Sequence, residues 1–493
     1  MNIIKEHFIS EEYRLDNFDV CIVGGGPAGY VSALKCAING LSAAIIEKEK
    51  FGGTCLNRGC IPTKAIYSKA KYLSKLKNPE YGFSVDGFSV NYNDIIDYKE
   101  KVVSTLVGGV EKLLKARNVR VFNGTGKITG KNNDNSGFVL TSTSEDGLKT
   151  EIYANNVIIS TGSSPLMIPS FNIDHKNIMT SDEILAIREI PESLIIIGAG
   201  VIGCEFANIF SEFGAGIKMI ELLPSILSTE DKDISKFVQK NFKSRNIDIM
   251  TSVEVGSIEP IEENKGAAVY LKSGEKFTAD KVLVSIGRKL NTDGLGLEKL
   301  AVKMDKRGKI EVDSHNETAV KGIYACGDII DGPMLAHKAS YDGIIAADNI
   351  AGIVKEKNYS VLPWSIYTNP PIGTVGLKEG DKGLEGIDYN VGRFSYAANG
   401  MALAMEESEG FLKVIVEEKS KRILGATGSG ADIPELIAEI ASYMHFGGTV
   451  FDIESTIHSH PTLSEIVPES ALDSIGEAIH KVNPRTAKKS REL

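Results

Sequence analysis

Two glycine-rich segments of this chain repeat each other at a constant offset of 174 residues. The first is DVCIVGGGPAGYVSALKCAINGLSAAIIEK (19–48), and the second is SLIIIGAGVIGCEFANIFSEFGAGIKMIEL (193–222). Each segment predicts a short apolar strand, a tight turn, an amphipathic helix and a second strand that ends in an acidic residue. Two such units constrain the chain to an α/β fold in which helices pack on parallel sheets.

The residues of both repeats suit a dinucleotide ligand. Glycines permit a tight turn and let the backbone approach a pyrophosphate at the positive N-terminus of the helix. These glycines are Gly24, Gly26 and Gly29 in the first unit and Gly198, Gly200 and Gly203 in the second. The acid at the end of the second strand, Glu47 or Glu221, can accept hydrogen bonds from a ribose hydroxyl. Glycines that serve packing alone are the alternative, but the complete strand, helix and acid in both copies favour two dinucleotide sites.

The segments that follow each repeat predict the domain organisation. VIISTGSSP (157–165) and VLVSIGRKLNT (282–292) each predict a buried strand that carries the chain from one domain to the other. We therefore expect two Rossmann-like dinucleotide-binding domains plus a C-terminal α+β domain devoted to assembly. The expected boundaries are 1–162 and 288–360 for the first domain, 163–287 for the second and 361–493 for the third.

Composition argues against several classes of function. The 55 Lys and Arg residues against 65 Asp and Glu give a net charge of −10, which disfavours nucleic-acid binding. No apolar run reaches about 18 residues, so no membrane span is expected. The acidic N-terminal segment resembles neither a secretory signal nor a transit peptide, and the basic tail PRTAKKSREL predicts a solvated terminus. Six cysteines in 493 residues are not a disulfide framework, so we expect a reducing, cytoplasmic location.

Cys55 and Cys60, in the run GGTCLNRGCIPTK, are the candidate redox residues. They follow the first nucleotide unit closely, which indicates two-electron redox chemistry. The run that continues through KAIYSKAKYLSKLK (64–77) predicts one helix with both cysteines in its first turns. A regular helix rises about 7.5 Å over five residues, whereas disulfide partners need Cα atoms within about 7 Å. A bridge therefore requires a distorted turn, for which Gly59 and Pro62 are suitable residues.

Two other interpretations of this cysteine pair stay open. One is a pair of unpaired buried thiols, which is the state we expect for Cys21, Cys36 and Cys204. The other is a metal site, but no second cysteine pair stands at ligand spacing, and we expect no bound metal.

HSHPTLSE (458–465) supplies a candidate acid–base pair. Thiol–disulfide exchange needs a thiolate, so a base beside the substrate thiol is required. His460 suits this role because imidazole titrates near neutrality, and Glu465 can hold its ring in one tautomer. A His-Pro step alone is more typical of a turn, so this interpretation depends on the dithiol.

With these residues assembled, the chain resembles the dihydrolipoamide dehydrogenases, which belong to the flavin-dependent pyridine nucleotide–disulfide oxidoreductases. The matching motifs, in family order, are GGGPAGY, GGTCLNRGCIPTK, GAGVIGCEFA, SIGR, YACGD, MLAHKA and HSHPTLSE. The resemblance implies FAD on the first repeat, NAD on the second and oxidation of dihydrolipoyl groups carried by another polypeptide of a 2-oxo acid dehydrogenase, acetoin or glycine-cleavage complex. It also implies a homodimer in which His460 of the partner subunit completes the site.

The resemblance assigns roles to individual residues. Cys60 is implied to adjoin the flavin, Cys55 to exchange with substrate, and Lys64 to pair with Glu205 beside the reactive flavin nitrogen. The residues implied for FAD are Gly24, Gly26, Pro27, Gly29, Glu47, Lys48, Gly53, Thr54, Lys64, Gly126, Thr161, Gly162, Asp328, Met334, Leu335, Ala336 and His337. Those implied for NAD are Gly198, Gly200, Val201, Ile202, Gly203, Glu205, Glu221, Val253, Gly287 and Arg288.

Some positions depart from the family pattern, and two other functions compete. The departures are Thr63 for Ser, Cys326 in YACGD, Ser340 and Tyr341 after MLAHKA, Pro371 in YTNPPIGTVG, and LGATGSGADIPELI around 425–431. One competitor is a reductase for glutathione or another small disulfide, but Glu221 and the lack of Arg in MIELLPSIL favour NAD over NADP. The other is a noncatalytic flavoprotein scaffold, against which the complete set of cysteines, His460 and Glu465 argues.

Overall fold

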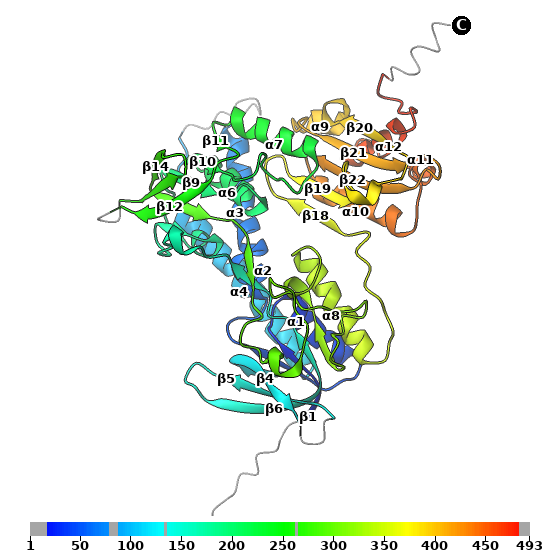
Figure 1. Cartoon of the computed structure of the whole chain (residues 1–493). Coiled ribbons are helices and arrows are strands. Elements are labelled where there is room, and N and C mark those ends of the chain that lie inside the picture. The colour runs from blue at the N-terminus through cyan, green and yellow to red at the C-terminus, as the bar shows by residue number, and fades with distance from the viewer. Residues whose placement is uncertain (1–16, 78–86, 133–135, 262–264, 483–493) are drawn as a thin grey trace, which may run out of the picture. The chain divides into compact units, whose positions relative to one another are not determined.

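The computed structural model describes residues 17–77, 87–132, 136–261 and 265–482, which fall into two compact units (Figure 1). The first unit lies within residues 1–57, 104–164 and 289–357, and the second lies within residues 58–103, 165–288 and 358–493. The N-terminal segment and the basic tail, for which we expected no signal and a solvated terminus, lie outside the described residues.

The first unit is built on a seven-stranded sheet. Its order is β3-β2-β1-β6-β5-β4, and β17 pairs with β6. The parallel strands are β1 (Asn17–Val23), β2 (Ala43–Glu47), β3 (Arg120–Asn123), β6 (Lys149–Ile159) and β17 (Ile323–Ala325). The antiparallel additions are β4 (Thr125–Lys131) and β5 (Phe138–Thr143). The central strand β1 is buried from Val20 to Val23, as its apolar sequence predicts.

Two helices of the first unit pack tightly against each other beside this sheet (Figure 1). They are α1 (Pro27–Ile38) and α8 (Ala336–Ile350). Small residues make the close approach possible, because a Cβ added at Gly343 in α8 would come within 2.5 Å of the Ala28 carbonyl oxygen in α1. This contact places the MLAHKA motif beside the first glycine-rich unit.

The second unit contains a five-stranded parallel sheet of order β11-β10-β9-β15-β8. Its strands are β8 (Ile178–Met179), β9 (Ser193–Ile197), β10 (Gly216–Ile220), β11 (Asp248–Met250) and β15 (Lys281–Val284). A smaller antiparallel sheet follows, with strands β12 (Val255–Pro260), β13 (Ala267–Leu271) and β14 (Lys276–Ala279). The associated helices are α3 (Cys60–Lys77), α5 (Ser181–Ile184), α6 (Val201–Glu212) and α7 (Lys232–Ser244), whereas α4 (Tyr92–Ala116) belongs to the second unit up to residue 103 and to the first from residue 104.

The C-terminal part of the second unit is an antiparallel sheet of order β18-β19-β22-β21-β20. Its strands are β18 (Pro363–Ile366), β19 (Ile372–Gly376), β20 (Tyr389–Ser395), β21 (Phe411–Glu417) and β22 (Ile423–Ser429). Its helices are α9 (Gly400–Ala404), α10 (Ile433–His445), α11 (Val450–Ser455) and α12 (Ile466–Asp473). A largely parallel sheet in the first unit, a parallel sheet in the second and an α+β C-terminal region confirm the predicted fold class.

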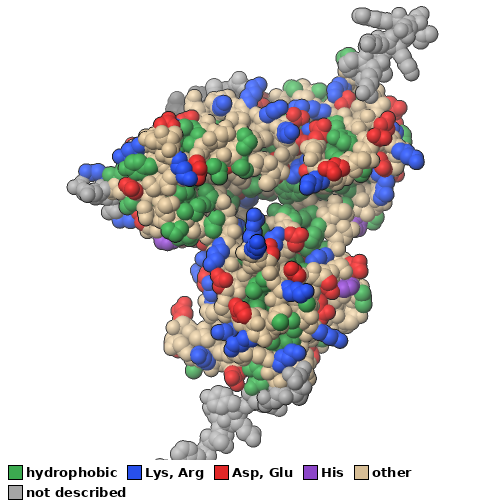
Figure 2. All heavy atoms as spheres, viewed as in Figure 1, with side chains coloured by type: hydrophobic (Ala, Val, Ile, Leu, Met, Phe, Trp, Pro, Cys, Tyr) green, Lys and Arg blue, Asp and Glu red, His purple; other side chains and the backbone are tan. Residues whose placement is uncertain are grey.

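Short elements connect these parts: α2 (Gly53–Arg58), β7 (Ser163–Pro165) and β16 (Arg288–Leu290). Among the described helices, none has both the length and the apolar character needed to cross a membrane. Basic and acidic side chains are interspersed over the face of the molecule drawn in Figure 2.

Candidate active site

The two glycine-rich turns have the same geometry. Gly24 and Gly198 both adopt positive φ, at 101° and 95°. An added Cβ would come within 2.5 Å of the carbonyl oxygen of Ser160 at the first position and of Ser285 at the second. The side-chain hydroxyl of each of these serines donates to the glycine's own carbonyl, at 2.9 Å and 3.0 Å. Only glycine fits either position, which explains the repeat seen in the sequence.

The acids that end the second strands bind these turns. Glu47 accepts hydrogen bonds from the backbone N–H groups of Gly25 (2.5 Å) and Glu49 (2.8 Å). Glu221 accepts two backbone N–H groups in the same way, at 2.6 and 2.8 Å. Each carboxylate is therefore fixed at the end of its strand, next to the turn, where a ribose hydroxyl can reach it.

The residues at the start of α1 and α6 fit a bound pyrophosphate. Both helices have a glycine as the N-cap residue, Gly26 or Gly200, and no side chain caps their first N–H groups. An added Cβ at Gly200 would meet no atom within 4 Å, and at Gly26 the nearest atom would be a Cα of Gly53 at 3.8 Å. Open space in front of uncapped N–H groups at the positive end of a helix suits an anionic group.

A buried ion pair holds the loop that presents Asp328. Lys338 and Asp342 in α8 are 2.8 Å apart, with side chains 1% and 0% exposed. Together they bind both polar groups of Gly327: the Lys338 ammonium donates to its carbonyl oxygen, and the Asp342 carboxylate accepts its N–H, both at 3.0 Å. Asp328 itself accepts a hydrogen bond from the Ser163 hydroxyl at 2.5 Å. Sequence reasoning missed this clamp, although the i,i+4 spacing of Lys338 and Asp342 was a visible signal.

Replacing Lys338 with Met should destabilise the protein by about 3–5 kcal/mol, because it leaves the Asp342 carboxylate buried without its cation. The free energy of unfolding, measured by urea titration of the purified protein, checks this. Lys35→Met is the matched control, since the buried Asp348 keeps Lys355 at 2.7 Å after that change. Unfolding free energies within about 1 kcal/mol of each other for the two variants would contradict the role of the clamp.

Cys326, the unusual thiol of YACGD, is part of the core of the first unit. Its side chain is fully buried, and its thiol donates to the carbonyl oxygen of Asp342 at 3.4 Å. Burial raises the pKa of this thiol well above its ordinary value, so the group stays protonated at neutral pH. Cys21, Cys36 and Cys204 are also buried, as expected.

The helix that carries the dithiol is broken. The sequence predicted one helix with both cysteines in its first turns, but the structure has α2 up to Arg58, a bend at Gly59 and α3 from Cys60 onward. Gly59 accommodates the bend, and its carbonyl accepts the side-chain hydroxyl of Thr63 at 2.7 Å. The distorted turn that a bridge between the cysteines requires is therefore present. Cys55 is half-buried in α2, and Cys60 is exposed.

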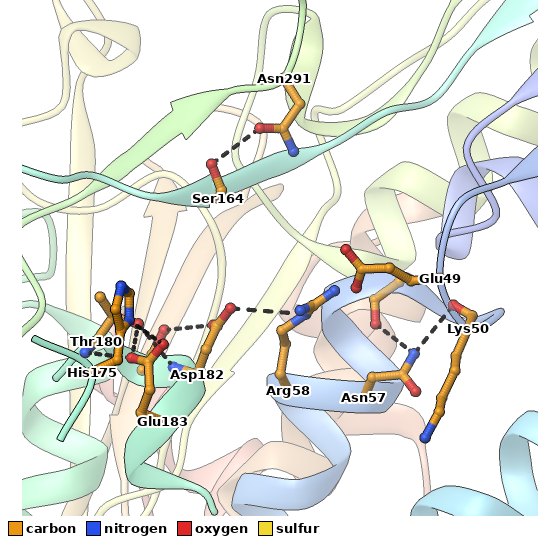
Figure 3. Close-up of polar contacts among 12 residues, drawn as sticks. Glu49, Lys50, Asn57, Arg58, Ser164, His175, Thr180, Asp182, Glu183 and Asn291 are labelled. Carbon is orange, nitrogen blue, oxygen red and sulfur yellow. Dashed lines mark hydrogen bonds and ion pairs between the residues drawn. The ribbon is translucent and has the colours of Figure 1, made fainter. Parts of the chain in front are cut away.

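Asn57 anchors the turn from within. Its side-chain amide donates to the carbonyl oxygens of Gly53 (2.9 Å) and Phe51 (3.0 Å), and more weakly to that of Lys50 (Figure 3). The Asn57 Oδ1 atom is buried and has no hydrogen-bond partner among the described residues. A buried acceptor without a donor fits a site that receives a polar ligand group.

Arg58, the last residue of α2, and Asp182 both belong to the second unit and lie near each other. Arg58 points toward Asp182, and their nearest atoms, Nε and Oδ2, are 3.8 Å apart (Figure 3). Burial raises the pKa of Asp182, while Arg58 opposes that shift. Next to it, Thr180 and Glu183 form a capping box at the start of α5, and Glu183 also contacts His175 at 2.8 Å. No sequence signal connected Arg58 with residue 182.

Lys64 and Glu205 form the expected ion pair. The Lys64 ammonium lies 2.9 and 2.8 Å from the two carboxylate oxygens of Glu205, joining α3 to α6. Burial acts to lower the pKa of the Lys64 ammonium. The negative charges of Glu205 and then of a Cys60 thiolate act in the opposite direction and are the larger effect together, so the pKa is raised. The ammonium is therefore a permanent charge one helical turn from the Cys60 thiol.

Tyr30 is a residue near Cys55 that sequence reasoning did not single out, although it ends the GGGPAGY motif. Burial raises the pKa of its phenol, and the charge of a Cys55 thiolate raises it further. The phenol is therefore neutral at physiological pH and can donate a hydrogen bond.

Of the two histidines in HSHP, only His460 has an available ring nitrogen. Its Nδ1 lies 2.9 Å from Glu465, and its Nε2 makes no hydrogen bond within the described part of the chain. Since a carboxylate only accepts, Nδ1 carries the proton and Nε2 holds the free lone pair. His458 instead faces acceptors on both sides, the Glu439 carboxylate at 2.6 Å and the Thr456 carbonyl at 3.0 Å. Of the two histidines, His460 is therefore the one whose ring presents a free lone pair.

The predicted site residues are distributed over both units. The first unit holds Gly24, Gly26, Pro27, Gly29, Glu47, Lys48, Gly53, Thr54, Cys55, Gly126, Thr161, Gly162, Asp328, Met334, Leu335, Ala336 and His337. The second holds Cys60, Lys64, Gly198, Gly200, Val201, Ile202, Gly203, Glu205, Glu221, Val253, Gly287, Arg288, His460 and Glu465. In the second unit, the described contacts join Lys64 to Glu205 and His460 to Glu465.

Comparison with known proteins identifies the family. Residues 18–343 match the pyridine nucleotide-disulphide oxidoreductase model. The chain belongs to this family. Residues 362–471 match the family's dimerisation domain, which covers the C-terminal sheet and its helices.

Similar proteins match nearly the whole chain. The mitochondrial dihydrolipoyl dehydrogenase of Dictyostelium discoideum is 38% identical over 483 residues, covering 96% of this chain and 97% of the relative. Among solved structures, LpdA from Mycobacterium tuberculosis has a TM-score of 0.86 at 25% identity, covering 92% and 98% of the two chains. RclA from Escherichia coli, an HOCl-induced flavoprotein disulfide reductase, has a TM-score of 0.81 at 27% identity, covering 92% and 99%.

Proposed function

We propose that this member of the pyridine nucleotide-disulphide oxidoreductase family oxidises protein-bound dihydrolipoyl groups to lipoyl groups and reduces NAD to NADH. The observation that carries the proposal is one chain with two equivalent dinucleotide turns, a cysteine pair at a broken helix and a His–Glu pair with a free Nε2. The substrate class comes from the name of the D. discoideum relative, a dihydrolipoyl dehydrogenase that aligns with this chain almost end to end.

The proposed cofactors are FAD and NAD, one on each turn. The first turn and the Asp328 loop belong to the FAD-binding domain, proposed as 1–162 and 288–360. The second turn belongs to the NAD-binding domain, proposed as 163–287, and 361–493 is the dimerisation domain. FAD supplies the two-electron chemistry that connects a dithiol with a nicotinamide. Glu221 favours NAD because its carboxylate repels a 2′-phosphate.

The protein's own groups carry the disulfide chemistry. His460 of the partner subunit accepts a proton from one substrate thiol at Nε2, and the resulting thiolate attacks the Cys55 sulfur. The bond between Cys55 and Cys60 breaks, and Cys60 leaves as a thiolate that the Lys64 ammonium favours. The second substrate thiol then attacks the first substrate sulfur, and a proton passes through the partner's His460 to Cys55, which leaves as a thiol with the electron pair of the broken bond while the lipoyl ring closes. The substrate has lost two electrons, and the protein dithiol has gained them.

The proposed assembly is a homodimer that acts on a lipoyl group of another polypeptide. Support comes from the dimerisation domain matched at 362–471. The lipoyl-bearing protein of a multienzyme complex is the proposed partner, and a reducing cytoplasm is the proposed location, since six cysteines, four of them buried, do not form a disulfide framework.

A second candidate function is reduction of a small disulfide. The observation that favours it is the structural likeness to RclA, a disulfide reductase, at a TM-score of 0.81. A small-disulfide reductase would differ from the main proposal in its substrate and in its preference between NAD and NADP.

A substrate panel tests the proposed function. The purified holoenzyme is assayed with dihydrolipoamide, reduced glutathione and other dithiols, each with NAD and with NADP. We expect dihydrolipoamide with NAD to give a kcat/KM at least about 10²-fold above every other pair. Preference for glutathione, or for NADP, would reject the proposed function in favour of the second candidate.

A further inference from the structure

Tyr367, at the end of β18, packs on the Lys64–Glu205 pair. The Lys64 ammonium lies 4.7 Å from the centre of the Tyr367 ring. The backbone N–H of Tyr367 donates to the same Glu205 carboxylate at 2.9 Å. Lys64 thus has two partners of different kinds: a carboxylate that neutralises its charge and an aromatic face that confines its position.

The Tyr367 ring is itself held in place. The ring of Tyr67 meets it edge to face, with centroids 5.5 Å apart and planes at 74°. The Tyr67 hydroxyl donates to the carbonyl oxygen of Thr368 at 3.0 Å, which fixes the neighbouring backbone. Burial raises the pKa of Tyr367, so the ring stays neutral and presents the negative face that attracts a cation. A long lysine side chain has considerable rotamer freedom, and a fixed aromatic wall removes part of it.

The cation that Tyr367 confines acts on Cys60. Cys60 and Lys64 stand four residues apart in α3, so their side chains share one face of the helix. A thiolate at Cys60 raises the pKa of Lys64, and by the same interaction the ammonium stabilises the thiolate. Moving the ammonium away therefore lowers the fraction of Cys60 that is ionised to thiolate at neutral pH.

We propose that Tyr367 is a positioning residue, whose ring face holds the Lys64 ammonium beside Cys60 and thereby sets the reactivity of that thiol. The proposal rests on the proposed function only in giving Cys60 thiolate a role in turnover. Lys64 and Glu205 make the ion pair, and Tyr367 determines where the positive end of that pair lies.

The test measures the Cys60 thiolate directly. In holoenzyme carrying Cys55→Ser, Cys60 is the thiol that iodoacetamide can reach, because the other four cysteines are buried. We expect Tyr367→Leu to slow alkylation at pH 7 by about fivefold and to move its pH midpoint upward. Tyr367→Phe keeps the ring face and should stay within about twofold of the parent.

A double-mutant comparison separates positioning from a general structural effect. In a Lys64→Met background the Tyr367→Leu change should have no further effect on alkylation, because the ammonium that it positions is gone. Equal rates for Tyr367→Leu and the parent, equal losses in the Phe and Leu variants, or an undiminished loss without Lys64 would each overturn the proposal. The assay uses neither lipoamide nor NAD, so a failure of the proposed function would appear separately, in the substrate panel.

Discussion

In a Cys60→Ser variant, NADH formation from dihydrolipoamide should fall by about 10³-fold or more, while NADH oxidation by artificial quinones persists. The reason is that dithiol oxidation needs a sulfur that can leave as a thiolate and hold the electron pair, and a serine oxygen cannot do this. The absorbance of NADH at about 340 nm, followed by stopped-flow and steady-state measurements, reports both reactions in the same preparation.

Cys36→Ala is the matched control for this loss. Burial raises the pKa of the Cys36 thiol to about 12, so it is an uncharged core group between α1 and the sheet. We expect that variant to keep its turnover with dihydrolipoamide. Full activity of the Cys60→Ser enzyme on free dihydrolipoamide would refute the proposed relay.

His460→Gln should lower kcat/KM for dihydrolipoamide by about 10²–10⁴-fold, the usual contribution of a positioned general base. Its Nε2 is the only ring nitrogen in HSHP with a free lone pair, and glutamine has no group of comparable basicity. Glu465→Gln should cost less, because the amide can still hold the ring while losing the charge that stabilises an imidazolium.

The pH dependence distinguishes the two members of the pair. Hydrogen bonds from the Thr462 backbone N–H and from His460 hold the pKa of Glu465 below its ordinary value. Since a lowered carboxyl pKa keeps the anion present until the pH falls below it, Glu465 remains ionised throughout the neutral range. Titration of Glu465 should therefore not limit kcat/KM in the neutral range, and Glu465→Gln should keep the acidic limb of the parent profile.

A surface histidine provides the control for that measurement. His175 contacts Glu183 at 2.8 Å and is exposed, with geometry similar to the His460–Glu465 pair. His175→Gln should leave both the rate and the acidic limb as they are in the parent. A kcat/KM in His460→Gln equal to that of the parent would show that the base lies elsewhere.

Local sequence patterns predicted the repeated parts of the site well. The atom that restricts Gly24 is the distant carbonyl oxygen of Ser160, but the hydrogen bonds of Glu47 come from backbone groups within its own strand–turn–helix unit. The same holds for the His460–Glu465 pair, whose members are five residues apart. The position of Lys64 beside Glu205 required the family resemblance, because 141 residues separate them.

Contacts between distant segments escaped sequence reasoning. Arg58 meets Asp182, and Tyr367 packs on Lys64, through tertiary contacts that no local pattern encodes. The structure has two helices where one was predicted. The chain bends at Gly59, between residues that favour a continuous helix.

The departures from the family pattern become clearer in the structure. Ser340 and Tyr341 stand where two acids are usual, and the acid that pairs with Lys338 is the next residue, Asp342. Pro371 lies against the other unusual segment: its carbonyl accepts the backbone N–H of Gly430 at 3.0 Å. These two departures are thus neighbours in the fold.

The solvent exposure of His460 bears on how the protein behaves when it is diluted. Its side chain is 77% exposed on its own chain, where Glu465 is its described side-chain partner. In the proposed dimer, each half therefore provides a proton acceptor that serves the other half. Turnover per polypeptide then follows the fraction of associated chains and declines by mass action once subunits separate, even though every chain stays folded.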